Sequence, residues 1–92
     1  MPVTVHYRGQ LSTAMGADSE EIELGQNESI QSLLQGLAKR GSKDFADIVL
    51  DDDGAPRRTL LVAVDGQQVV GLDELLDTGV HEITLIPPIS GG

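Results

Sequence analysis

The sequence predicts a single α+β domain in which a mixed sheet of about five strands packs on one main helix. Three observations predict this class. Several short segments alternate apolar with polar residues, as half-buried strands do, and one segment instead has apolar residues at helical spacing. The chain of 92 residues also has room for only one modest core, because folding at this size removes roughly 60 to 65% of the unfolded surface from water.

Two strands are predicted in the first quarter of the chain. Apolar and polar residues alternate in residues 3–7 and again in residues 20–24, which is the period of a half-buried strand. Residues 14–18 are suited to a connection longer than a tight turn. The two strands are therefore expected to form a hairpin with a long loop.

The next segment predicts the main helix. Ser29 is suited to its N-cap and Gly41 to the position that ends it. The basic pair Lys39 and Arg40 would face the negative end of the helix dipole. The apolar residues fall at i, i+3, i+4 and i+7, so they lie on one face: Ile30, Leu33, Leu34 and Leu37.

Beyond the helix, residues 45–50 form a short apolar patch, which predicts an irregular or 3₁₀ segment. The polar loop that follows contains three consecutive aspartates before Gly54 and resembles part of a calcium loop. The spacing fails, because with Gly54 at the sixth loop position the first and twelfth positions are Val49 and Leu60, neither of them a ligand. A solvated loop is expected there, with weak cation binding as the alternative.

Three further strands are predicted in the last third of the chain. Residues 59–64 are nearly all apolar and precede Asp65-Gly66, a strong hairpin signal that predicts a short fourth strand near residues 68–70. Residues 72–76 indicate one helical turn. Residues 82–86 predict the fifth strand, which is expected to lie beside the first and to leave the C-terminus projecting from the sheet.

Composition and charge exclude several classes of function. The chain has no cysteine, so disulfides, zinc-thiolate sites and a cysteine nucleophile are excluded. Six basic against fifteen acidic residues give a net charge of −9, which makes nucleic acid and anionic membranes poor partners. Neither a signal peptide nor a long apolar run is present, so a cytoplasmic location is expected.

Histidines and acidic residues do not indicate a catalytic or metal site. His6 and His81 lie far apart in the sequence and are expected to face solvent. The strand residues Glu20, Glu21 and Glu23 are expected to form a solvated face, with a steering patch for a partner as the alternative. No catalytic constellation or metal-ligand spacing is found, so no catalytic and no metal-binding residue is predicted.

The C-terminal segment carries the strongest functional signal. Pro87 and Pro88 end the last predicted strand because neither can donate a ladder hydrogen bond, and they stiffen the chain beyond it. The final Gly91-Gly92 lacks side chains and can pass through a narrow channel. A frayed end is the alternative, although two terminal glycines arise by chance with a probability on the order of 0.5%.

A terminal carboxylate, with a reference pKa of about 3.5, is ionised at neutral pH and is a poor electrophile. Conversion to an acyl-adenylate would activate it toward a persulfide or thiolate. No group in this chain is suited to catalyse that step. An ATP-using partner enzyme is therefore implied.

The segment from Leu85 to Gly92 reads Leu-Ile-Pro-Pro-Ile-Ser-Gly-Gly and resembles the C-terminus of the MoaD/ThiS family of ubiquitin-like sulfur carriers, most of all the small subunit of molybdopterin synthase. The resemblance implies a β-grasp domain over residues 1–88 and a flexible tail over residues 89–92. It implies that an E1-like enzyme adenylates Gly92 with ATP, and that a sulfurtransferase or persulfide donor converts it to a thiocarboxylate. The carrier itself would hold no cofactor.

The same resemblance assigns roles to neighbouring residues. Gly91 and Ser90 would thread the tail into a partner, and an apolar docking surface would map onto Leu85, Ile86 and Ile89. The sulfur acceptor would be the large subunit of molybdopterin synthase. Alternatives are delivery to thiamine, cysteine or tRNA thiolation, conjugation of the chain to lysines as a protein modifier, and a plain interaction domain.

Overall fold

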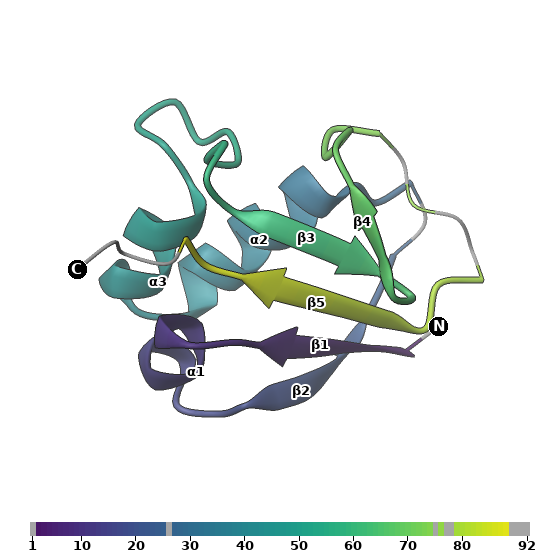
Figure 1. The fold of residues 1–92 in the computed structure, drawn as a ribbon, viewed down its shortest axis with the longest axis horizontal. Helices are drawn as coiled ribbons and strands as arrows, with labels where there is room; N and C mark the ends of the chain where they lie inside the picture. The colour runs from purple at the N-terminus through teal and green to yellow at the C-terminus, as the bar shows by residue number, and fades with distance from the viewer. Residues whose placement is uncertain (1, 26, 75, 77–78, 89–92) are drawn as a thin grey trace.

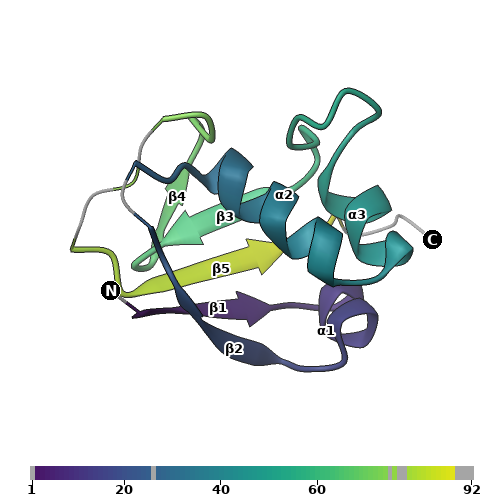
Figure 2. The same ribbon diagram turned by 180° about the vertical axis from the view of Figure 1, so that it is seen from behind.

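The computed structural model describes residues 2–25, 27–74, 76 and 79–88. Within them a five-stranded mixed sheet is covered on one face by α2, while α1 and α3 lie together at one end (Figures 1 and 2). The elements in chain order are β1 (Pro2–Tyr7), α1 (Gln10–Met15), β2 (Ser19–Glu23), α2 (Ile30–Arg40), α3 (Lys43–Val49), β3 (Leu61–Val64), β4 (Gln67–Val69) and β5 (Glu82–Ile86). The predicted α+β class is confirmed.

The strand order is β2-β1-β5-β3-β4, so β5 occupies the centre of the sheet. It pairs in parallel with β1, where Tyr7 lies opposite Leu85, and antiparallel with β3. The β1–β2 and β3–β4 pairs are also antiparallel. The prediction that the first and last strands lie side by side is thus confirmed.

Helix α2 begins and ends as predicted. The Ser29 hydroxyl accepts a hydrogen bond from the Ser32 amide at 3.1 Å, and the Ser32 hydroxyl accepts one from the Ser29 amide at 2.9 Å. At the other end Gly41 has an extended backbone, with φ −89°. A Cβ there would lie 2.7 Å from Met15 Sδ and 3.1 Å from Leu37 O. Close packing against α1 is therefore the reason for glycine at this position.

The predicted hairpin of β1 and β2 is confirmed, but three predictions on local structure were wrong or incomplete. Residues 43–49 form an α-helix, α3, rather than an irregular or 3₁₀ segment. The Ser42 hydroxyl caps it by accepting from the Phe45 amide at 3.2 Å, and Phe45 and Val49, one helical turn apart, are fully buried. The predicted hairpin loop between β1 and β2 contains the short helix α1, of which only Leu11 is fully buried.

The segment predicted as one helical turn is also different. Residues 72–74 form a turn rather than a helix, and Leu75 lies outside the described residues. No helix in the described ranges is both long enough and apolar enough to cross a membrane.

The core lies between the sheet and the helices and is almost entirely aliphatic. The rings of Tyr7 and Phe45 meet edge to face, with centroids 5.9 Å apart and an interplanar angle of 88°. This contact joins the end of β1 to α3. The buried apolar residues are Val3, Val5, Tyr7, Leu11, Ile30, Leu33, Leu34, Leu37, Phe45, Val49, Leu60, Val62, Val80, Ile83 and Leu85.

Candidate functional site

The predicted site is the C-terminal segment, of which the structure describes the part up to Pro88. The predicted sulfur-carrying residue Gly92, the threading residues Gly91 and Ser90, and the docking residue Ile89 all lie outside the described residues. What the structure places is the strand that leads to them. β5 runs in the centre of the sheet toward the end at which α1 and α3 lie (Figure 1).

The beginning of this C-terminal segment packs against the turn that follows β1. The Arg8 amide donates to the Leu85 carbonyl at 3.1 Å, which extends the parallel pairing by one bond. Pro87 is buried, and its Cγ would lie 3.3 Å from a Cβ built on Gly9. This segment is therefore packed against the domain as far as Pro87.

The predicted docking surface needs a correction at Leu85. Its side chain is fully buried at 0% exposure, because it points into the core with Ile83 on the same side of β5. Ile86 has the opposite orientation and is half-buried. It lies directly across from Leu61 on β3, which is 44% exposed. The apolar pair on the outer face of the sheet is thus Ile86 and Leu61.

The sequence analysis missed Leu61 as well as Val70. Val70 is 89% exposed, and these two are the exposed large hydrophobic residues in the described part of the chain. Both line a groove of about 400 Å³ that is also lined by Arg57 and Arg58. Strand alternation with the β3–β5 register would have placed Leu61 beside Ile86.

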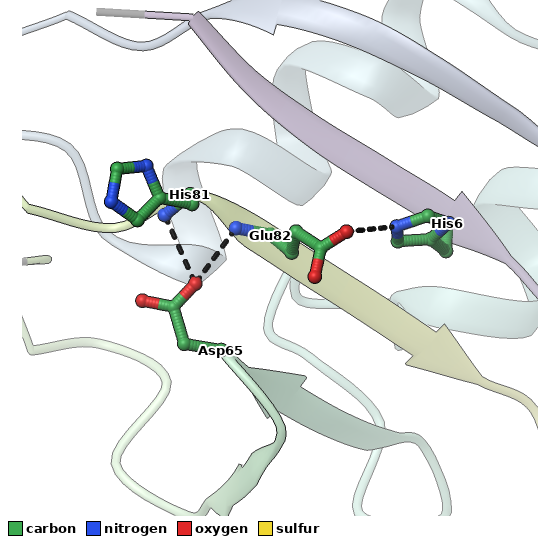
Figure 3. Close-up of polar contacts among 4 residues, drawn as sticks. All are labelled: His6, Asp65, His81 and Glu82. Carbon is green, nitrogen blue, oxygen red and sulfur yellow. Dashed lines mark hydrogen bonds and ion pairs between the residues drawn. The ribbon is translucent and has the colours of Figure 1, made fainter.

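The beginning of β5 carries a cluster of hydrogen bonds on the surface (Figure 3). Asp65 Oδ1 accepts from the amides of His81 at 3.0 Å and Glu82 at 2.9 Å. Both bonds lower the pKa of the Asp65 carboxyl, and the bond from the Glu82 amide has the larger effect. His6 Nε2 lies 3.1 Å from Glu82 Oε1, whereas the His81 ring points away from His6 (Figure 3).

The prediction of solvated glutamates on β2 is wrong for Glu20. Its carboxylate accepts from the Tyr7 hydroxyl at 2.7 Å and forms an ion pair with Arg40. The hydrogen bond from Arg40 is the main cause that lowers the pKa of Glu20, and burial is the main cause that raises the pKa of Tyr7. Glu21, by contrast, is exposed.

The acidic loop after α3 uses its first carboxylate for its own backbone. Asp51 Oδ1 accepts from the amides of Asp53 at 2.9 Å and Ala55 at 3.0 Å. Across the part of the chain that the structure describes, no three His, Asp or Glu side chains are grouped to hold a metal ion.

A family model described as the ThiS family matches residues 5–92. Among solved structures, SAMP1 from Haloferax volcanii, a small archaeal modifier protein, has a TM-score of 0.82 at 22% identity and covers 100% of both chains. A putative molybdopterin converting factor, subunit 1, from Pyrococcus furiosus has a TM-score of 0.73 at 29% identity, over 97% of this chain and 99% of that one.

A chain of the BexX/CysO complex from Amycolatopsis orientalis has a TM-score of 0.70 at 24% identity, over 98% of this chain and 99% of that one. Among curated proteins the sequence found no match. The likeness to these solved structures shows the β-grasp, ubiquitin-like fold that the resemblance implied.

Proposed function

This chain belongs to the ThiS family of small ubiquitin-like sulfur carriers, and on that basis we propose that it carries sulfur as a thiocarboxylate on Gly92. The observation that carries the proposal is the extent of the family match, which runs through Gly91 and Gly92. Four residues follow Pro88 and can span at most about 14 Å when extended. That reach suits delivery of the last carbonyl carbon into a partner's active site.

The chemistry requires partner proteins. On an E1-like enzyme, a Gly92 carboxylate oxygen attacks the α-phosphorus of ATP and pyrophosphate leaves. The terminal sulfur of a donor persulfide then attacks the acyl-adenylate carbon, AMP leaves, and an acyl persulfide forms. A second donor thiolate attacks the donor's sulfur, which breaks the S–S bond and leaves the thiocarboxylate on this chain and a disulfide on the donor. These thiols belong to partners, because the chain has no cysteine.

Docking on the activating enzyme involves the outer face of the sheet beside the tail. Ile86 and Leu61 form an apolar pair there, next to the point at which β5 ends. The net charge of −9 favours a partner with a basic surface, because complementary charge speeds encounter. We infer that these two features select the activating enzyme, with Ile89 as a third apolar contact.

The acceptor that we propose is the large subunit of molybdopterin synthase, which would take the sulfur onto a pterin precursor. Support comes from the 29% identity to the putative molybdopterin converting factor subunit. Carriage of sulfur for thiamine, cysteine or tRNA thiolation uses the same activated Gly92. The alternative from a different class of function is conjugation of this chain to lysines as a protein modifier. We retain it because the chain shares its fold with SAMP1.

The test is the intact mass of the chain after incubation with the activating enzyme, ATP and a persulfide donor. Replacement of one oxygen by sulfur adds about 16 Da. Deletion of Gly92, or addition of one alanine after it, shifts the reacting carbon by about 3.5 Å and should abolish this gain. Gly91→Ala keeps the register and serves as the control, with a slower gain expected.

If the chain without Gly92 gained this mass as readily as wild type, the terminal-carbonyl mechanism would be wrong. To separate the acceptors, the purified thiocarboxylate is offered to the large molybdopterin synthase subunit with its precursor and, in parallel, to a thiazole synthase. Loss of about 16 Da with only the first supports the proposed pathway. A mass gain on a lysine-containing target instead would favour the modifier alternative.

A further inference from the structure

We propose that the contact between Gly9 and Pro87 fixes the direction in which the C-terminal tail starts, which makes Gly9 a positioning residue for the activation of Gly92. The inference rests on the proposed function for its consequence, but the contact itself is a feature of the domain. Here the name tail seat means Arg8, Gly9 and Pro87. It joins the turn after β1 to the end of β5, at positions that are far apart in the sequence.

The first observation is the backbone of Gly9. Its φ of 53° with ψ of −129° is a conformation that residues with a Cβ rarely adopt. A Cβ at this position would also lie 3.3 Å from Pro87 Cγ and 3.9 Å from Pro87 Cδ. The conformation therefore favours glycine, and a Cβ would in addition need the Pro87 ring to move by a few tenths of an ångström.

The second observation is that hydrogen bonds to the first residues of α1 hold the turn in place. The Gly9 carbonyl accepts from the Ser12 hydroxyl at 2.9 Å and from the Ser12 amide at 3.2 Å. The Leu11 amide donates to the Arg8 carbonyl at 3.0 Å, and the Leu11 side chain is fully buried. Gly9 cannot move without disturbing the first turn of this helix.

The third observation is on the β5 side. The Arg8 amide donates to the Leu85 carbonyl at 3.1 Å, and Pro87 is buried although it lies beyond the last strand residue. The chain is thus held one residue past Ile86. The packed contact with Gly9 thus lies at Pro87, five residues before Gly92.

These contacts have a consequence for activation. A displacement of about 1 Å at a reacting centre can cost on the order of a hundredfold in rate. A Cβ on Gly9 has to push Pro87 away or shift the turn, and either change alters the angle at which the tail starts. The docking face with Ile86 and Leu61 would be retained, so the effect should fall on kcat rather than on KM.

The experiment compares Gly9→Ala with Gly16→Ala. Gly16 ends the same helix with φ 75° and has nothing within 4 Å of a built Cβ, so alanine there adds backbone strain without touching Pro87. Pro87→Ala is the second variant, which removes the ring and leaves Gly9 intact. Each folded variant is measured by hydrogen exchange at the Arg8 amide and by the kcat and KM of thiocarboxylate formation.

We expect Gly9→Ala and Pro87→Ala to speed exchange of the Arg8 amide on the order of fivefold, because its bond to Leu85 is loosened. We expect kcat to fall about tenfold to a hundredfold with KM within about twofold of wild type. Gly16→Ala should leave the Arg8 exchange and kcat near wild type. The double variant should lose no more than Gly9→Ala alone, because both changes act at one contact.

A folded Gly9→Ala with the kcat of wild type would overturn the proposal, as would an equal fall in kcat for Gly16→Ala. If Gly9→Ala does not fold, Pro87→Ala decides by the same measurements. If wild type gains no thiocarboxylate, the proposed function fails, whereas unchanged Arg8 exchange in Pro87→Ala refutes the seat by itself.

Discussion

The two ends of β5 are held in different ways. Where the strand begins, an exposed carboxylate, Asp65, accepts two backbone hydrogen bonds, and Glu82 contacts His6 with side-chain exposures of 60% and 30%. Where it ends, a buried proline packs on a glycine and one backbone hydrogen bond continues the ladder. Backbone hydrogen bonds hold both ends. What differs is the side-chain contribution, which is exposed charge at the first end and packing of a buried proline at the second.

The difference corresponds to what each end does in the proposed carrier. Exposed charge interactions contribute little to stability and weaken with salt or acid. Packing of Pro87 against Gly9 fixes the relative position of the two segments, because displacement of either residue opens a gap or creates a clash. The end of β5 that leads to the tail has the second kind of contact. The three variants below test this contrast, from the largest expected effect to the smallest.

Leu11→Ala tests the packed end. Leu11 is fully buried and is the core residue of α1, so its truncation leaves a cavity beneath the tail seat. We expect the free energy of unfolding to fall by about 2 to 4 kcal/mol, measured by urea denaturation. Thr13→Ala, on the exposed side of the same helix, should change it by less than about 0.5 kcal/mol. A similar small change for Leu11→Ala would mean that α1 does not support the seat.

Tyr7→Phe tests the polar contact nearest the packed end. Tyr7 lies opposite Leu85, is 2% exposed, and donates its hydroxyl to Glu20. Phenylalanine keeps the edge-to-face contact with Phe45 and loses only this bond, so the free energy of unfolding should fall by about 1 kcal/mol. In the Glu20→Gln background the same change should have a different effect, because the two groups interact. The free energies of unfolding of the two single variants and the double variant are compared by thermal or urea denaturation. If the effects of the two substitutions were strictly additive, the contact between Tyr7 and Glu20 would be contradicted.

Much of the sheet and the main helix follows from local patterns in the sequence. The alternation in residues 3–7 and 82–86 and the helical spacing of Ile30 with Leu37 arise from burial of one face, which each segment specifies alone. Helix α3 also had local signals, since Ser42 is its N-cap and Phe45 and Val49 lie one turn apart. Its apolar stretch was simply too short to distinguish a helix from an irregular segment.

The site was less predictable because it depends on contacts between distant residues. Leu85 and Ile86 are both apolar neighbours, and only the register decides that Leu85 is buried and Ile86 faces outward. Helix α1 has one fully buried residue and no side-chain cap at Gly9, so it leaves little trace in the sequence. Gly9 had no signal at all, because its partner Pro87 is 78 positions away.

Asp65→Asn tests the charged end and should have the smallest effect, because Asp65 is exposed to solvent. Asparagine tolerates the left-handed backbone at this position, φ 50°, and keeps an acceptor oxygen, so the change removes only the charge. The Glu82 and His81 amides lower the pKa of Asp65 below its ordinary value of 3.8. Folding therefore stabilises the ionised form.

The sign of the pH dependence follows from that direction. The contribution of the Asp65 charge is complete above the unfolded pKa, near 3.8, and is lost as the pH falls through the lower folded pKa. Wild type should therefore melt slightly above Asp65→Asn at pH 7, and the two should converge as the pH falls through the lowered pKa of Asp65. Glu82→Gln is the control, because it removes the charge next to His6 and leaves Asp65 unchanged. Asp65→Asn made in this background should show the same convergence with its parent at low pH. A difference in melting temperature that stayed constant from pH 7 to pH 2 would show that geometry, rather than charge, holds the beginning of β5.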